Sequence, residues 1–214
     1  SSTTDMVFDR AEIIQGKEEY DTLPGSYDDN GEVEQLVIYL KDRNYNLTLE
    51  LHYYVYEKCD IITRSAKLVN SGNESVRLER LMSMQLDLNE SDYELSFFNG
   101  AWAREMNRSR IPIRAGKYVN ESVTGTSSNR ANPFFMIGRS STTEDYGECY
   151  GFNLIYSGNH YEAAQVNSYG KLRLVSGINP ATFSYIIEAG KCFEAPEAVL
   201  TYSYKGYNRM SHNM

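Results

Sequence analysis

The feature that most constrains the fold is an alternation of apolar and polar side chains along most of the chain. Over residues 46–56 one face would carry Leu47, Leu49, Leu51, Tyr53 and Val55, and the other Asn46, Thr48, Glu50, His52 and Tyr54. Successive side chains of a β-strand point to opposite faces, so this pattern predicts a long, half-buried strand. A helix would require apolar residues at spacings of three and four instead.

Similar segments recur to the end of the chain, separated by short turn sequences such as Asn-Gly, Tyr-Gly and Asn-Pro. We predict further strands at 36–40, 60–69, 76–88, 93–98, 134–137, 150–156, 165–175, 182–188 and 198–204. Residues 115–132, rich in Gly, Ser, Thr and Asn, are predicted to form a long loop, and no segment has a convincing amphipathic helical pattern. Many strands with short connections favour one all-β domain of two packed antiparallel sheets.

Composition excludes several classes of partner. Hydrophobic residues make up 41% of the chain, which is enough to build a core. The 29 acidic residues outnumber the 21 basic ones and give a net charge of −8. An acidic surface repels phosphates, so we expect neither nucleic acid nor a membrane as a partner.

The three cysteines, Cys59, Cys149 and Cys192, are widely spaced and odd in number. This spacing argues against a disulfide framework and offers no Cys-x-x-Cys metal site. We therefore expect free, buried or half-buried thiols and a cytoplasmic location. No stretch resembles a signal peptide or a membrane span.

The motifs of common catalytic sites are missing from the sequence. His52, His160 and His212 have no second ligand at metal-binding spacing, and there is no nucleophile elbow or phosphate-binding glycine loop. We expect no metal, no cofactor and no catalytic residue in this chain.

One cluster is less ordinary. The single tryptophan, Trp102, lies two residues after Gly100 of the turn sequence Asn99-Gly100, and the charged residues Arg104 and Glu105 follow it. A tryptophan face can stack on a sugar while Arg and Glu bind its hydroxyls. The alternative, which we favour, is that Trp102 anchors a core or a domain interface with Arg104 and Glu105 paired beside it.

An ordered series of short motifs resembles the N-terminal domain of the microbial α-galactosidases of glycoside hydrolase family 36. The motifs are LPG at 23–25, DIITR at 60–64, RLMS at 80–83, LDL at 86–88, GAWARE at 100–105, GTSS at 125–128, NPF at 132–134, GECYGF at 147–152, YSGN at 156–159, GINP at 177–180, FEAPE at 193–197 and MSH at 210–212. Each motif is weak alone, but the series runs in order through almost the whole chain.

The resemblance implies a two-sheet β-supersandwich of the galactose-mutarotase type, spanning 1–214 as a single N-terminal domain that is truncated and lacks the family's earliest strands. It implies that a catalytic (β/α)₈ barrel follows, with two aspartates that hydrolyse galactosides such as melibiose and raffinose by a retaining mechanism. The domain would dock on its own barrel, help a homo-oligomer to form and shape the active site, and would be inactive alone. The candidate residues for these contacts are Trp102, Arg104, Glu105, Asn132 and Glu148.

Two other functions are compatible with the residues. A stand-alone carbohydrate-binding module would account for the 18 tyrosines and for Trp102. A small mutarotase-like enzyme would need a histidine pair and a carboxylate, for which the sequence offers no matching motif.

Overall fold

The computed structural model describes residues 4–214, and the alternating segments form antiparallel strands. The strands are β1 (Met6–Gln15), β2 (Glu34–Asp42), β3 (Leu47–Tyr56), β4 (Ile61–Asn70), β5 (Val76–Leu78), β6 (Met82–Leu88), β7 (Glu94–Ala101), β8 (Arg104–Pro112), β9 (Gly116–Glu121), β10 (Phe134–Gly138), β11 (Cys149–Leu154), β12 (His160–Val166), β13 (Leu172–Ile178), β14 (Tyr185–Ile187), β15 (Cys192–Glu194) and β16 (Ala198–Ser203). Two short 3₁₀ turns, Glu57–Cys59 and Pro180–Thr182, and one helix, α1 (Gly206–Asn213), complete the described elements.

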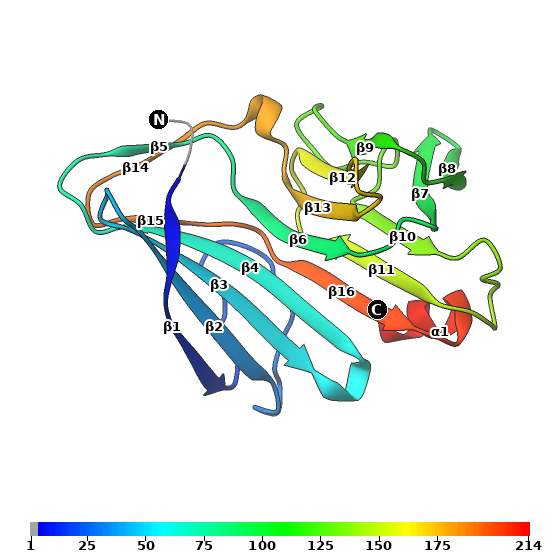
Figure 1. Cartoon of the computed structure of the whole chain (residues 1–214), viewed down its shortest axis with the longest axis horizontal. Coiled ribbons are helices and arrows are strands. Elements are labelled where there is room, and N and C mark those ends of the chain that lie inside the picture. Colours follow the sequence, from blue (N-terminus) through cyan, green and yellow to red (C-terminus); the bar gives the residue numbers. More distant parts are fainter. Residues whose placement is uncertain (1–3) are drawn as a thin grey trace.

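A single large sheet forms the base of the molecule (Figure 1). Its strands follow the order β1-β2-β3-β4-β16-β11-β10-β7-β8, and β15 pairs with the far end of β4. β16, the last strand in sequence, lies between β4 and β11 and therefore joins the two halves of the sheet.

Two smaller sheets lie on one face of this base. One has the order β6-β13-β12-β9, and the other pairs β14 with β5. The main core lies under the four-stranded sheet, where Met84 and Leu174 meet Ile137 and Phe152 of the base. A second core, under β5 and β14, joins Leu78 and Ile187 to Leu47 and Leu68. The predicted antiparallel sandwich is confirmed, with its upper layer divided into two parts.

Strand β3 shows how this division affects burial. Leu47 is buried under β5 and β14, whereas Val55, on the same face at the other end of the strand, is exposed. Tyr54, predicted to lie on the polar face, is buried. The reason is that residues 17–26 cover the opposite face, held by an ion pair of 2.7 Å between the buried side chains of Lys17 and Glu197.

Several boundaries differ from the prediction. The segment 76–88 is divided into β5 and β6, which lie in separate sheets, and 165–175 is the middle of the β12–β13 hairpin. The predicted loop 115–132 contains β9. Arg80 interrupts the apolar face of 76–88 at the break between β5 and β6, and the Tyr169-Gly170 turn sequence lies at the break in 165–175.

The sequence reading also overlooked α1, which is one short amphipathic helix. Tyr207 and Met210 are buried against Met136 and Cys149, and Gly151 leaves the space that the Met210 sulfur fills. Of the cysteines, only Cys149 is buried. Cys59 and Cys192 are exposed, so the expectation of buried thiols was wrong for these two.

Replacing Leu174 by Ala should lower the free energy of unfolding by about 2–5 kcal/mol, because this fully buried side chain fills the main core. Tyr169→Ala, in the exposed β12–β13 turn, should change it by less than about 0.5 kcal/mol. Urea unfolding followed by circular dichroism measures both. Equal effects of the two substitutions would contradict the assigned core.

Candidate functional site

The β7–β8 hairpin carries Trp102 at its tip. The turn consists of Trp102 and Ala103, and the Trp102 side chain is 91% exposed. Ala103 has a positive φ of 60°, and Glu105 stabilises the turn by accepting a hydrogen bond of 3.0 Å from the Ala103 amide. Within residues 4–214 no ion pair joins Glu105 to Arg104. Trp102 is therefore not a core anchor of this chain, and the predicted pairing beside it was wrong.

The hairpin contacts the loop that leads into β10. The Asn132 amide donates to the Phe98 carbonyl at 3.1 Å, and the Asn132 side chain lies 3.5 Å from the Met106 sulfur. At Gly100 a Cβ atom would come within 2.8 Å of the Asn129 carbonyl, so glycine allows this close approach. Four predicted residues, Trp102, Arg104, Glu105 and Asn132, thus belong to one region, which we call the hairpin end.

Glu148 lies away from the hairpin end. It directly precedes β11, whose first residue, Cys149, pairs with Gly138 at the far end of β10. Gly138 follows Asn132 by six residues, which corresponds to roughly 20 Å along an extended chain at the usual rise per residue. Tyr93 donates a hydrogen bond of 3.0 Å to the Glu148 carboxylate, and Arg139 lies 3.5 Å from it.

A buried His–Glu pair, overlooked by the sequence reading, supports the loop beside the hairpin end. His160 Nδ1 lies 2.9 Å from Glu162 and Nε2 lies 2.9 Å from the Ala131 carbonyl. Both ring nitrogens thus face acceptors, which an imidazolium satisfies. Burial lowers the pKa of His160, but the hydrogen bond and charge of Glu162, the Ala131 carbonyl and nearby Glu121 outweigh it and raise the pKa overall. His160 and Glu162 are two residues apart on one strand and therefore point to the same face. This spacing is the sequence feature that could have revealed the pair.

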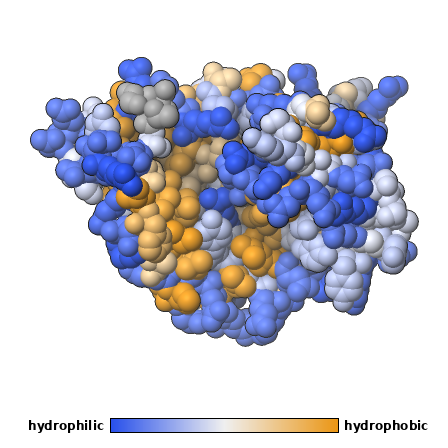
Figure 2. All heavy atoms as spheres, viewed as in Figure 1, coloured by the Kyte–Doolittle hydropathy of each residue, from blue (hydrophilic) through white to orange (hydrophobic). Residues whose placement is uncertain are grey.

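A large hollow lies on the face of the base sheet beside β6, and Figure 2 shows apolar side chains gathered on this side of the molecule. We call it the groove. It has a volume of about 790 Å³. Its apolar floor and walls include Val55, Ile61, Ile62, Leu86, Phe152 and Leu200. Ile62 is 44% exposed there, in the middle of the base sheet.

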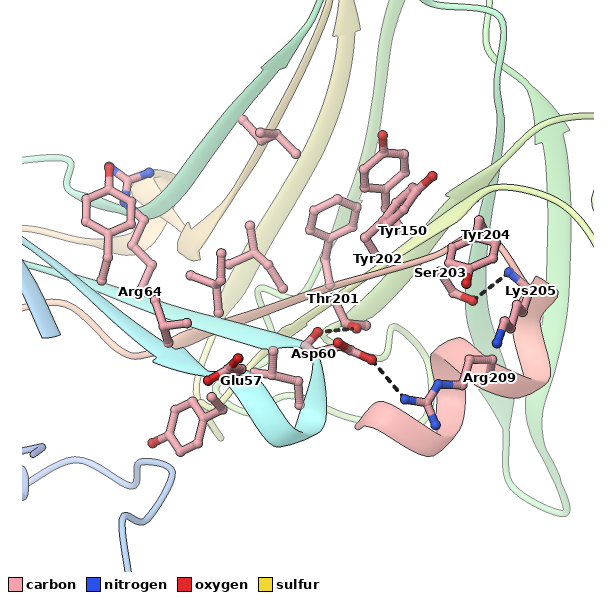
Figure 3. Close-up of a pocket in the computed structure, with 18 of the residues that line it drawn as sticks. Glu57, Asp60, Arg64, Tyr150, Thr201, Tyr202, Ser203, Tyr204, Lys205 and Arg209 are labelled. Atoms are coloured by element: carbon pink, nitrogen blue, oxygen red, sulfur yellow. Dashed lines mark hydrogen bonds and ion pairs between the residues drawn. The ribbon is translucent and has the colours of Figure 1, made fainter. Parts of the chain in front are cut away.

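Tyrosines and charged groups surround this floor (Figure 3). The rings of Tyr150 and Tyr202 lie 4.9 Å apart between their centroids, and Tyr204 follows along β16. At the rim Arg209 of α1 pairs with Asp60 at 2.8 Å. These groups suit the binding of a mainly apolar partner with polar edges.

Arg64 of β4 is the unusual polar group of the groove. Its guanidinium lies over the Tyr53 ring, 5.1 Å from the centroid, and Nη1 donates to the Gln85 carbonyl at 3.2 Å. Its Nε is buried without a hydrogen-bond partner, and burial lowers the pKa of the side chain. An arginine on the same strand face as Ile62 and Ala66 was the signal that could have identified it in the sequence.

No group of three or more His, Cys, Asp and Glu side chains is arranged to hold a metal ion within residues 4–214. Over the same residues, no helix has the length and apolar character needed to cross a membrane.

Comparisons with known proteins agree on one family. A family model described as the glycosyl hydrolase family 36 N-terminal domain matches residues 1–188. Alpha-galactosidase AgaA of Geobacillus stearothermophilus is 38% identical over 212 residues, which are 99% of this chain and 29% of that protein. The crystal structure of the α-galactosidase from Lactobacillus brevis superposes with a TM-score of 0.97 at 37% identity, covering 100% of this chain and 29% of that one.

A variant of AgaA solved in complex with raffinose gives a TM-score of 0.97 at 38% identity and covers 100% of this chain and 30% of that one. This chain therefore spans less than a third of the length of these relatives.

The free energy of unfolding should fall as the pH rises above about 6.5. A raised pKa in the folded state means that the stabilisation by His160 is complete below the ordinary histidine value and is lost as the pH passes the folded value. His160→Gln should remove this part of the pH dependence, whereas His212→Gln, on the exposed face of α1, should keep it. Urea unfolding between pH 6 and 9 measures this, and identical slopes for wild type and H160Q would contradict it.

Proposed function

Because the chain belongs to the glycosyl hydrolase family 36 N-terminal domain family, we propose that it works as the non-catalytic N-terminal domain of an α-galactosidase. The whole enzyme would remove terminal α-galactosyl residues from galactosides such as melibiose and raffinose. The binding of raffinose by an AgaA variant supports this substrate class.

The observation that carries the proposal is the difference in coverage. The whole chain superposes on solved α-galactosidases, yet it fills only 29–30% of their length. Most of each relative therefore lies outside the region that this chain matches. We assign catalysis to that remaining part, with two closely set aspartates in a (β/α)₈ barrel as the expected catalytic groups.

The hairpin end supports a contact role for this domain. A tryptophan that is almost fully exposed on a rigid two-residue turn loses little conformational entropy when it is buried by another surface. Arg104 and Asn132 beside it supply donors for the polar rim of such a contact. We propose that the hairpin end docks on the enzyme's own barrel or on a second subunit, and helps to shape the active site. Glu148, at the other end of β10, would contribute to a separate contact.

A stand-alone carbohydrate-binding module is the second candidate. The tyrosines along the groove favour it, because aromatic faces stack on sugars. This function would show itself as saturable binding of melibiose or raffinose by the 214-residue chain. A mutarotase-like enzyme has less support, since none of the three histidines lines the groove.

The exposed thiols of Cys59 and Cys192 favour a reducing compartment, where they would not form disulfides. We therefore propose a cytoplasmic location for the enzyme.

Hydrolysis of an aryl α-galactoside tests the proposed function. A longer protein that includes the expected barrel should turn the substrate over, whereas the 214-residue chain should not. Release of the aryl group is followed by absorbance, and replacing either barrel aspartate provides the inactive control. Turnover by the 214-residue chain that persists through repurification would contradict the proposal.

Trp102→Ala should lower the stability of the longer protein by about 2 kcal/mol, because a tryptophan at the centre of a contact carries much of its energy. The same change in the 214-residue chain should cost less than about 0.5 kcal/mol. Tyr169→Ala, an equally exposed aromatic residue in another turn, is the matched control and should have a small effect in both proteins. Urea unfolding of all variants measures this, and an equally small effect of W102A in both proteins would remove the contact role.

A further inference from the structure

The upper layer of the sandwich has an open strand edge above the groove. Within residues 4–214, β6 pairs only with β13, and β5 pairs only with β14. The chain passes from β5 to β6 through residues 79–81, and the two strands belong to separate sheets of the upper layer (Figure 1). Gln85 and Leu86 of β6 line the groove on this side. An open edge carries unpaired backbone groups that can accept another strand.

The side chain of Arg64 indicates what the groove lacks. Its Nη1 reaches the carbonyl of Gln85 at the β6 edge, which is where an added strand would run. The Nε of the same group is buried without any hydrogen-bond partner, and within residues 4–214 Arg64 takes part in no ion pair. A buried donor nitrogen without an acceptor is costly, so the occupant should bring a carboxylate or carbonyl oxygen to the Arg64 Nε atom.

We propose that the groove is filled by an extended segment of the same polypeptide from outside residues 1–214, which adds to the free edge of β6 as a strand. Its inward side chains are apolar and cover Ile62 and Leu200, and an acidic side chain meets Arg64. The added strand extends the β6-β13-β12-β9 sheet over the floor of the groove.

The shape and chemistry of the groove favour a strand over a sugar. A sugar would need several polar groups converging on its hydroxyls, whereas the floor is apolar along its length and Asp60 is already paired with Arg209. The groove offers an unpaired strand edge and an apolar floor. A β-strand suits both, because its backbone pairs with β6 while every second side chain covers the floor.

The source of the strand follows from the length of the relatives, and in this respect the inference rests on the proposed function. More than two thirds of each relative lies outside the region that this chain matches. A segment of the same polypeptide has an effective concentration near the millimolar range, which a separate protein or a second copy would rarely reach.

Peptide binding tests the proposal. Fluorescein-labelled peptides of about 14 residues, tiled through the parts of the longer protein outside residues 1–214, are titrated into the 214-residue chain and followed by anisotropy. We expect one peptide, with alternating apolar residues and an Asp or Glu, to bind saturably. Hydrogen exchange should then slow at residues 82–88 of β6 but not at β9, the other edge of the same sheet.

Two pairs of variants locate the binding. Arg64→Met should weaken the peptide about tenfold or more, and Arg77→Met, at an exposed position of β5, should leave it unchanged. Ile62→Asp places a charge on the groove floor and should abolish binding. The control is Ile186→Asp, at an exposed position of β14, which should leave peptide binding unchanged. Both Ile side chains are partly exposed, so either variant should fold, and circular dichroism checks this.

Four outcomes would overturn the proposal: no peptide binds, binding leaves β6 exchange unchanged, the 214-residue chain instead associates with itself through β6, or raffinose protects the groove in place of a peptide. The α-galactosidase assay of the longer protein is independent of these results. If a peptide binds but the longer protein is inactive, only the proposed function is refuted. If the longer protein is active but no peptide binds, only the proposal that a strand fills the groove is refuted.

Discussion

The rest of the structure depends on the pairing of β16 with two strands that are far from each other in sequence. Val199 and Leu200 lie opposite Thr63 and Ile62 of β4 on one side and Asn153 and Phe152 of β11 on the other. Without these backbone hydrogen bonds, the base sheet would divide into two parts, β1–β4 with β15 and the strands β7, β8, β10 and β11, each with a new open edge. The buried Lys17–Glu197 ion pair acts at the same place, since Glu197 directly precedes β16. Such long-range pairing closes large loops and is expected to form late in folding.

This joined sheet holds the two functional surfaces at a distance from each other. The hairpin end lies at the β7–β8 edge, and its loop is fixed by the His160–Glu162 pair and by Asn120, which donates to the Asn132 carbonyl at 2.8 Å. The groove lies over β4, β16 and β11, in the middle of the sheet. A stiff base thus presents one surface suited to contact with a folded partner and one suited to an extended strand.

Part of the candidate site could be predicted from the sequence. Trp102 near a turn sequence drew attention to the right segment, although Asn99-Gly100 lies within β7 and the turn itself is formed by Trp102 and Ala103. Its exposure was not predictable, since a core anchor and a surface contact have the same local sequence. Arg64 and the groove were overlooked because the floor of the hollow is uncovered only where the upper layer ends at β6, and this edge depends on how distant strands pair.

The sequence by itself determined the all-β class, many of the strand segments and, through its ordered motifs, the family, although it missed β1, β8 and β9. The alternation of side chains is a local property of each segment, and the motifs gain weight from their order along the chain. Both can therefore be recognised without knowing the tertiary structure. Only the tertiary structure decided which strands are neighbours, that Tyr54 is buried while Val55 is exposed, and that His160 meets Glu162 and the Ala131 carbonyl. These facts depend on what covers each face of the sheet, and the covering segments are distant in sequence.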